Sequence, residues 1–140
     1  MIDTTIVPKE HIKIIWHQIK EYAEKCAKYT YGRYTADDIL EGLLTKDQQL
    51  WVPFNVITKE IIGFWVTEVV EYPQMNVLVL HFVGGKDFPS WTEKGFPKLQ
   101  KFAKEAGCKI MESYGRPGWE VMWKDHGYKK RFVFYELPVE

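Results

Sequence analysis

Four side chains on strand-like segments have the chemistry to move a proton. Glu68, His81 and Glu112 carry groups that accept protons, and the Tyr114 hydroxyl can donate one, so we consider Tyr114 a candidate acid. Each also has an ordinary structural interpretation. His81 in VLVLHFV is typical of a hydrogen-bonded core histidine, and an aromatic at a strand end, such as Tyr114, packs. Glu68 suits a sheet edge, and Glu112 suits an ion pair with Arg116 or a lysine.

The strands expected to hold these residues follow two predicted helices. Apolar residues recur at helical spacing from Lys9 to about Tyr29, which predicts one long amphipathic helix. Thr35 suits the N-cap of a second helix, which ends near Lys46. Strand-like runs at residues 50–56, 61–72 and 76–83 are joined by short connections, and they predict an antiparallel meander.

A third helix and another strand are expected next. Ser90 is followed three residues later by Glu93, which indicates a capping box at the start of the helix. Pro97 inside this helix predicts a kink or a division into two short helices. The helix ends at Gly107, and residues 108–114 read as a strand.

The segment GRPGWEVMWKDHGY, residues 115–128, reads as a strand exit, a short helix and a helix stop. Trp119, Met122 and Trp123 share one face of this helix, so that face should be buried. Gly127 suits the left-handed position after the helix, and Tyr128 is expected to pack back on its last turn. Residues 131–137, RFVFYEL, are predicted to form the last strand.

Composition narrows the class of protein. A chain of 140 residues with 46% hydrophobic content is sufficient for one domain, residues 1–140. Nineteen basic and nineteen acidic residues balance, so the global charge does not favour nucleic-acid binding. A cluster of basic residues within 124–131 suits a solvated face. His81 and His126 lie on other elements than His11 and His17, which are six residues apart and not three or four, so no metal site is expected. Two cysteines, Cys26 and Cys108, suggest a reducing compartment, and no apolar run is long enough to predict membrane binding.

The predicted order of elements resembles the GCN5-related N-acetyltransferase (GNAT) fold. VLVLHFVGG with the helix ending AKEAG is similar to one part of that family's pattern, and WKDHGY is similar to another. The resemblance implies an α/β (α+β) domain with a mixed central sheet of about five to six strands, flanked by helices on both faces. YPQM, FVGG, FAKEAGC and GRPGW together resemble a group of bacteriophage proteins of this fold, some related to podovirus internal virion proteins.

The resemblance implies acetyl-coenzyme A as the cofactor. Family members hold its pyrophosphate with backbone amides in a glycine loop at a helix N-terminus, and this chain has GGKDFPSWTEKG at that place. A glycine pair after a strand is also typical of a simple turn. The positions that the resemblance makes candidates for cofactor binding are Val83, Gly84, Gly85, Lys86, Arg116 and Trp119.

One departure from the family concerns the acid of the reaction. Trp123 stands where the family places a tyrosine that protonates the leaving thiolate, and an indole N–H lacks that acidity. We therefore expect a phage protein that keeps the fold, has lost catalysis, and acts as a virion component or by binding a host protein. Its expected place is the host cytoplasm or the virion, and a homo-oligomer is a further expectation. The alternative is an active acetyl-CoA-dependent N-acetyltransferase acting on a protein or small amine.

Overall fold

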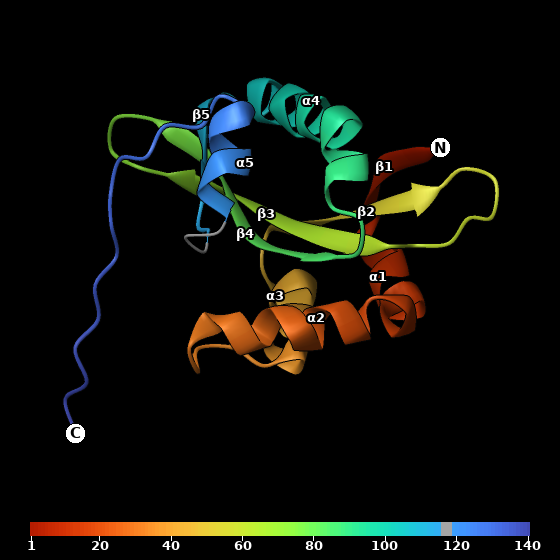
Figure 1. Cartoon of the computed structure of the whole chain (residues 1–140), viewed down its shortest axis with the longest axis horizontal. Helices are drawn as coiled ribbons and strands as arrows, with labels where there is room; N and C mark the ends of the chain where they lie inside the picture. Colours follow the sequence, from red (N-terminus) through yellow and green to blue (C-terminus); the bar gives the residue numbers. More distant parts are fainter. Residues whose placement is uncertain (116–118) are drawn as a thin grey trace.

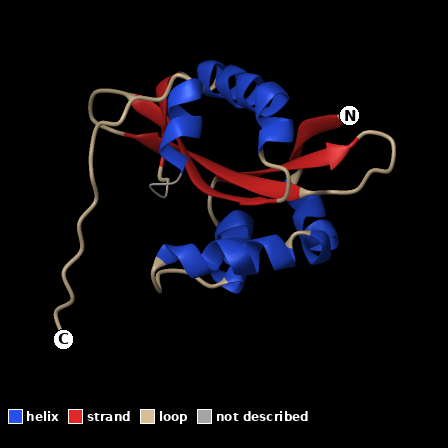
Figure 2. Cartoon of the chain, in the orientation of Figure 1, coloured by secondary structure: helices blue, strands red, loops and turns tan. Residues whose placement is uncertain are grey.

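The computed structural model describes residues 1–115 and 119–140 and shows one five-stranded mixed sheet between two layers of helices (Figures 1 and 2). The sheet has the order β1-β2-β3-β4-β5. β1 to β4 pair antiparallel and β5 pairs parallel to β4, as the crossover through a helix requires. The strands are β1 Ile2–Val7, β2 Gln48–Asn55, β3 Gly63–Glu71, β4 Asn76–Gly85 and β5 Cys108–Ser113. The predicted fold class is confirmed.

Helices cover both faces of the sheet (Figure 1). The first layer holds α1 Lys9–Ile15, α2 Lys20–Ala27 and α3 Ala36–Thr45. The second layer holds α4 Pro89–Glu105 and α5 Glu120–Asp125. Thr35 caps α3 as predicted, and it forms a capping box with Asp38.

Two separate hydrophobic clusters lie on the two faces. Under α1 to α3, aliphatic side chains such as Ile12, Ile39 and Leu43 pack on the sheet. Under α4 and α5, the cluster is mostly aromatic and includes Trp65 and Trp91, neither of which is exposed. The helices therefore close the sheet from both sides with cores of different composition.

The N-terminal half differs from the prediction in two elements. β1 was not predicted, although five of its six residues are β-branched and favour a strand. It forms by pairing with β2 along its whole length, from Ile2 opposite Asn55 to Val7 opposite Leu50. The single helix predicted from Lys9 to Tyr29 is divided by a 3₁₀ turn at Trp16–Gln18, and it ends in another at Lys28–Thr30.

The start of α4 also differs from the prediction. The helix begins at Pro89, and the Ser90 hydroxyl donates to the carbonyl of Asp87, so Ser90 and Glu93 form no capping box. α4 is one continuous helix with Pro97 inside, which rules out two short helices. Its ribbon changes direction along its length (Figure 1).

The predicted last strand is absent from the sheet. Residues 131–137 pair with no strand of the described residues, and the chain beyond α5 runs away from the sheet as an extended tail (Figure 1). A strand signal is local, whereas a strand forms only where a neighbouring edge supplies hydrogen-bond partners. No helix of the described residues is long and apolar enough to cross a membrane.

Candidate ligand-binding pocket

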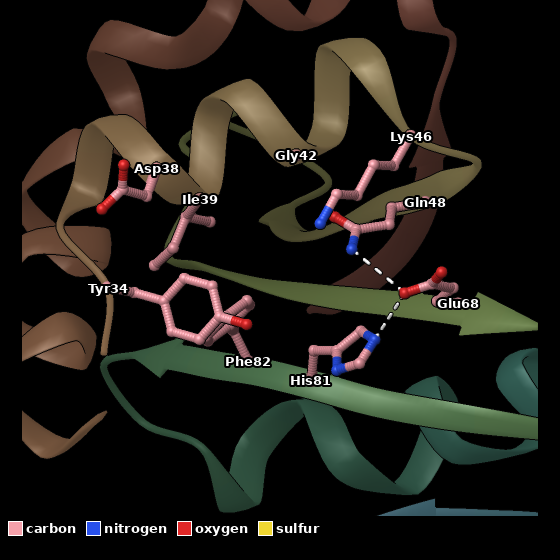
Figure 3. A pocket seen from close by; sticks show the side chains of 9 residues that line it. All are labelled: Tyr34, Asp38, Ile39, Gly42, Lys46, Gln48, Glu68, His81 and Phe82. Carbon is pink, nitrogen blue, oxygen red and sulfur yellow. Dashed lines mark hydrogen bonds and ion pairs between the residues drawn. The ribbon is translucent and has the colours of Figure 1, made fainter. Parts of the chain in front are cut away.

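A pocket opens between α3 and the sheet, at the start of β2 and across the middle of β3 and β4 (Figure 3). Its volume is about 260 Å³. The residues that line it are Tyr34, Asp38, Ile39, Gly42, Lys46, Gln48, Glu68, His81 and Phe82. Two of the residues proposed from the sequence, Glu68 and His81, therefore share one cavity.

Glu68 accepts hydrogen bonds from two other residues of this pocket. His81 Nε2 lies 2.7 Å from Glu68 Oε1, and Gln48 Nε2 donates to the same oxygen at 3.1 Å (Figure 3). The side chains of His81 and Glu68 are 26% and 29% exposed, so water reaches both. The sheet-edge interpretation of Glu68 is wrong, because β3 lies between β2 and β4.

A β-bulge places His81 on this face. Val66 pairs with Phe82 and Thr67 pairs with Leu80, so His81 is the extra residue of β4. Leu80 packs in the aromatic cluster, whereas Phe82 packs in the aliphatic cluster with His81 beside it in the pocket. The bulge thus turns two consecutive side chains of β4 toward α3.

The hydrogen bonds determine which atoms of Glu68 and His81 remain available to a ligand. An ionised carboxylate only accepts, so His81 donates its Nε2 proton to Glu68, and a neutral ring then carries its free lone pair on Nδ1. Both donors use Oε1, which leaves Glu68 Oε2 as an acceptor for a ligand. Tyr34 and Phe82, whose rings meet edge to face at 4.9 Å, supply an apolar wall beside it. The pocket therefore offers the Glu68 carboxylate next to aromatic surface, and the charged side chains of Asp38 and Lys46 also line it.

The other two proton-transfer candidates lie elsewhere. Glu112 on β5 accepts a hydrogen bond from the Tyr72 hydroxyl at 2.8 Å, which raises the pKa of Tyr72; no ion pair of Glu112 with a lysine occurs in the described residues. In the register Glu112, Val79 and Glu68 form one row across the sheet, so Glu112 is about 10 Å from Glu68. Tyr114 lies beyond β5 and is 67% exposed, so its aromatic ring is not packed.

The glycine pair serves packing between strands and helices. A Cβ on Gly85 would lie 2.4 Å from the carbonyl oxygen of Ile62, and φ at Gly85 is +141°. A Cβ on Gly84 would lie 2.9 Å from the Phe64 ring and 3.2 Å from the carbonyl oxygen of Tyr22. Both glycines are therefore required by close contacts within the protein, whether or not a ligand is bound.

The loop that follows has several of its donors already paired and so offers few of them to the pyrophosphate of acetyl-CoA. The amide of Lys86 donates to Ile62, the amide of Ser90 donates to Asp87, and Pro89 has no N–H. The Lys86 ammonium group bonds Glu60 at 2.8 Å, and this bond raises the pKa of Lys86. Three of the positions that would present donors to an anion are thus already paired or lack a donor.

Aromatic rings fill the space between the starts of α4 and α5. The β4–β5 pairing ends at Leu80 and Ser113. Phe88 stacks on Trp119 at 5.3 Å and meets Trp123 at 6.4 Å, and Val83 packs in the same cluster. Arg116 lies outside the described residues. Of the candidate cofactor positions that are described, Val83 and Trp119 belong to a hydrophobic cluster and Lys86 to a surface ion pair.

Trp123 is a core residue, as its helical spacing predicted. It is 9% exposed, and its indole N–H is buried without an acceptor in the described part of the chain. A Cβ on Gly115 would lie 2.2 Å from its Nε1, so Gly115 makes room for the ring. Gly127 has φ +88°, and Tyr128 packs on Trp123 at 5.0 Å, both as predicted.

Gln48 is the pocket residue that sequence reasoning missed. It is 9% exposed and begins β2, two residues before the predicted strand. The signal in the sequence is Gly42 inside α3: a Cβ there would lie 2.9 Å from Gln48 Oε1. An isolated glycine in a helical pattern indicates such a close approach. Within the described residues, no cluster of three or more His, Cys, Asp and Glu side chains could hold a metal ion.

Solved structures share this architecture over their whole length. A probable acetyltransferase aligns with a TM-score of 0.69 at 14% identity, covering 100% of this chain and 98% of the other. A putative acetyl transferase from Pyrococcus furiosus gives 0.68 at 19% identity, covering 98% and 100%. An aminoglycoside acetyltransferase from an uncultured soil metagenomic sample, in complex with sisomicin, gives 0.67 at 10% identity, covering 99% and 97%. No family model and no curated protein matches the sequence.

Proposed function

We propose, with the GNAT acetyltransferase fold as the premise, that the pocket binds a primary amine and that the protein recognises a partner carrying that amine without transferring an acetyl group to it. The observation that carries the proposal is Glu68, whose Oε1 is held by His81 and Gln48 while Oε2 stays available. An ammonium group pairs with a carboxylate oxygen, and the aliphatic stem of a lysine fits against the Tyr34 and Phe82 rings.

The fold of known acetyltransferases supports this choice of ligand class. The aminoglycoside acetyltransferase that aligns with the chain was solved with an aminoglycoside, an amine-bearing sugar. The absence of turnover is proposed from the aromatic stack of Phe88, Trp119 and Trp123 and from the paired amides of the loop after β4. The phage origin, the virion or host partner and the cytoplasmic location stay predictions.

Binding is tested with a small lysine derivative. We expect Nα-acetyl-lysine amide to shift the NMR signals of Glu68 and His81 with a Kd of about 1 mM, which corresponds to about 4 kcal/mol of binding free energy. The charged hydrogen bond to Glu68 supplies about 1.5–3 kcal/mol of it, and the packing of the stem on the aromatic rings supplies the rest. The Nε-acetylated form keeps the stem and loses the charge, so it should bind at least about tenfold more weakly. Glu68→Gln should cause the same loss. Glu71→Gln, on the same strand and exposed, is the matched control and should bind like the wild type. Equal binding of both derivatives contradicts the proposal.

A second function is favoured by the His81 tautomer. With Nε2 donating to Glu68, the lone pair on Nδ1 can take a proton from an amine, which is the step a general base performs in acyl transfer. This supports an active N-acetyltransferase, the alternative that the sequence left open. Acetyl-CoA would then have to enter where the aromatic stack now lies.

Thermal melting with acetyl-CoA distinguishes the two functions. A cofactor bound at ~10 μM and present at ~1 mM adds about 2.7 kcal/mol and raises the melting temperature by several degrees. We expect no shift and no thiol release when lysine amide is added. A shift with thiol release that is lost in His81→Phe would establish the enzyme instead. A shift without release would mean that the cofactor site is intact and only the acid is missing, which contradicts the role given to the aromatic stack.

A further inference from the structure

The tail after α5 exposes large apolar side chains in a strand-like sequence. Residues 129–140 have no helix or strand. Their exposed fractions range from 57% at Val133 to 94% at Val139, in the set Phe132, Val133, Phe134, Tyr135, Leu137 and Val139. Aromatic and β-branched residues of this kind favour a strand that pairs on at least one side. The tail therefore lacks a strand to pair with among the described residues of the single chain.

The sheet has an open edge that matches this tail. β5 pairs with β4 on one side, and the described residues place no strand on its other side. Ile110, in the middle of β5, is 51% exposed. β5 has six residues, Cys108–Ser113, and the apolar part of the tail, residues 132–137, also has six. An exposed edge strand is a template for pairing with another chain.

The tail is held away from the edge of its own sheet. Tyr128 is fixed under α5, where its amide donates to the carbonyl of Trp123 at 3.0 Å. Beyond it, Arg33 from the loop after α2 pairs with Glu136 at 2.9 Å and lies over the Phe134 ring at 5.2 Å. The tail thus runs toward the helical layer and past the body of the protein (Figure 1).

We propose that two copies of this chain exchange their tails, each laying residues 132–137 as an added strand on β5 of the other. The exchange is isologous and closes with two copies, because each chain gives one strand and receives one. It pairs the open edge of β5 with backbone hydrogen bonds and covers apolar side chains on both segments. Ile110 and the phenylalanines are exposed in the single chain for this contact. The partner is thus a second copy, and the added strand is the one that the sequence predicts.

The first test is the mass of the full chain in solution. Light scattering at ~50 μM should give about 33 kDa, twice the 16.6 kDa of one chain. Phe132 is 92% exposed, and Phe132→Glu places a charge in the new strand, so it should shift the mass to 16.6 kDa. Val139→Glu introduces the same charge at an equally exposed position beyond the pairing segment and should stay dimeric. A monomeric wild type, or a dimer unaffected by Phe132→Glu, overturns the proposal.

The second test distinguishes exchange from pairing within one chain. Aligned antiparallel, residues 132–137 place Leu137 opposite Cys108. Chains carrying Leu137→Cys with Cys26→Ser and Cys108→Ser are mixed with chains carrying only Cys26→Ser, and a mild oxidant is added. A disulfide between the two kinds of chain is expected. Phe132→Cys in the same background is the control, because it lies about 16 Å away along the strand and should not link. A chain with both Cys108 and Leu137→Cys that links internally at monomer mass would overturn the proposal.

Discussion

The face of the sheet under α3 keeps a cavity with polar groups, whereas the face under α4 and α5 is filled with rings. On the first face, a bulge turns His81 toward Glu68, and both side chains stay partly in water. On the second face, Phe88 stacks on Trp119, and Trp65 and Trp91 are fully buried. In acyl transfer one molecule brings the acyl group and another accepts it. In the proposed function the pocket under α3 takes the acceptor amine, and the packed rings under α4 and α5 exclude the cofactor.

The contrast predicts that the two faces respond differently to substitution. Side chains of the aromatic cluster should affect mainly the free energy of unfolding, because their contacts are with each other. Side chains of the pocket should affect mainly ligand binding, because their remaining hydrogen-bond capacity faces the cavity. The following substitutions test this difference, beginning with the largest expected effect.

Trp91→Ala should cause the largest loss of stability. Trp91 is fully buried, meets Phe88 at 4.7 Å and Trp65 at 5.1 Å, and donates its indole N–H to the carbonyl of Lys86. Removing it should lower the free energy of unfolding by about 3–5 kcal/mol, measured by urea denaturation. Tyr114→Ala is the control and should change it by less than about 0.5 kcal/mol, because Tyr114 is 67% exposed. A small loss at Trp91 would mean that the cluster is loosely packed and can open for a cofactor.

Gly85→Ala comes next and tests the role of the glycine pair. The new methyl would lie 2.4 Å from the carbonyl oxygen of Ile62, at a φ of +141°, so we expect a loss of about 3 kcal/mol. Gly107→Ala is the matched control, with φ +78° and open space around the added atom. It should lose only about 1 kcal/mol. Equal losses would show that the close contact with β3 is not what requires Gly85.

Glu68→Gln should have a smaller effect on stability. The amide keeps the shape of the carboxylate, but it loses the charge that strengthens the bonds from His81 and Gln48. We expect a loss of about 1 kcal/mol, since both groups are partly solvated. A double-mutant cycle with Gln48→Ala should give a coupling energy of about 0.5–1 kcal/mol. A coupling near zero would separate Gln48 from the polar group of the pocket.

Much of the fold follows from local signals in the sequence. The meander of β2, β3 and β4 has long strand-like runs with short turns, and Thr35 with Asp38 marks the start of α3. β1 was not predicted although its β-branched residues favour a strand, and its place in the sheet depends on pairing with β2. The tail has a strand-like sequence but no neighbouring strand among the described residues. These two errors have the same cause: pairing between strands is decided by neighbours that are distant in the sequence.

The pocket was less accessible to prediction than the fold. Glu68 and His81 were identified by their chemistry, but their 2.7 Å contact depends on the register of β3 on β4 and on the bulge. Neither the register nor the bulge can be predicted from the spacing of residues in the sequence. Gln48 was missed because a glutamine before an apolar run reads as a polar flank. Trp123 was placed correctly, because three apolar residues at helical spacing share a face regardless of the partner.

The smallest effect is expected at the rim of the aromatic face, where Lys98 of α4 reaches β1. Lys98 Nζ lies 2.8 Å from Asp3 Oδ1 and donates to the carbonyl of Thr4. The hydrogen bond from Lys98, followed by the one from the Thr4 amide, lowers the pKa of Asp3. Asp3→Asn should lower the free energy of unfolding at pH 7 by less than about 1 kcal/mol, because both side chains are partly solvated.

The sign of the pH dependence follows from that lowered pKa. A carboxyl group that binds a proton less readily in the folded state stabilises the fold above its unfolded pKa, near 3.8, and the contribution disappears as the pH falls through its lower folded pKa. The difference between wild type and Asp3→Asn should therefore be present at pH 7 and shrink below about pH 4, as measured by urea unfolding across that range. In a Lys98→Met background most of this pH dependence should be lost. The part that remains comes from the hydrogen bond that the Thr4 amide donates to Asp3. If the dependence is unchanged without Lys98, the ion pair does not join α4 to the sheet, and the aromatic rings alone hold that layer in place.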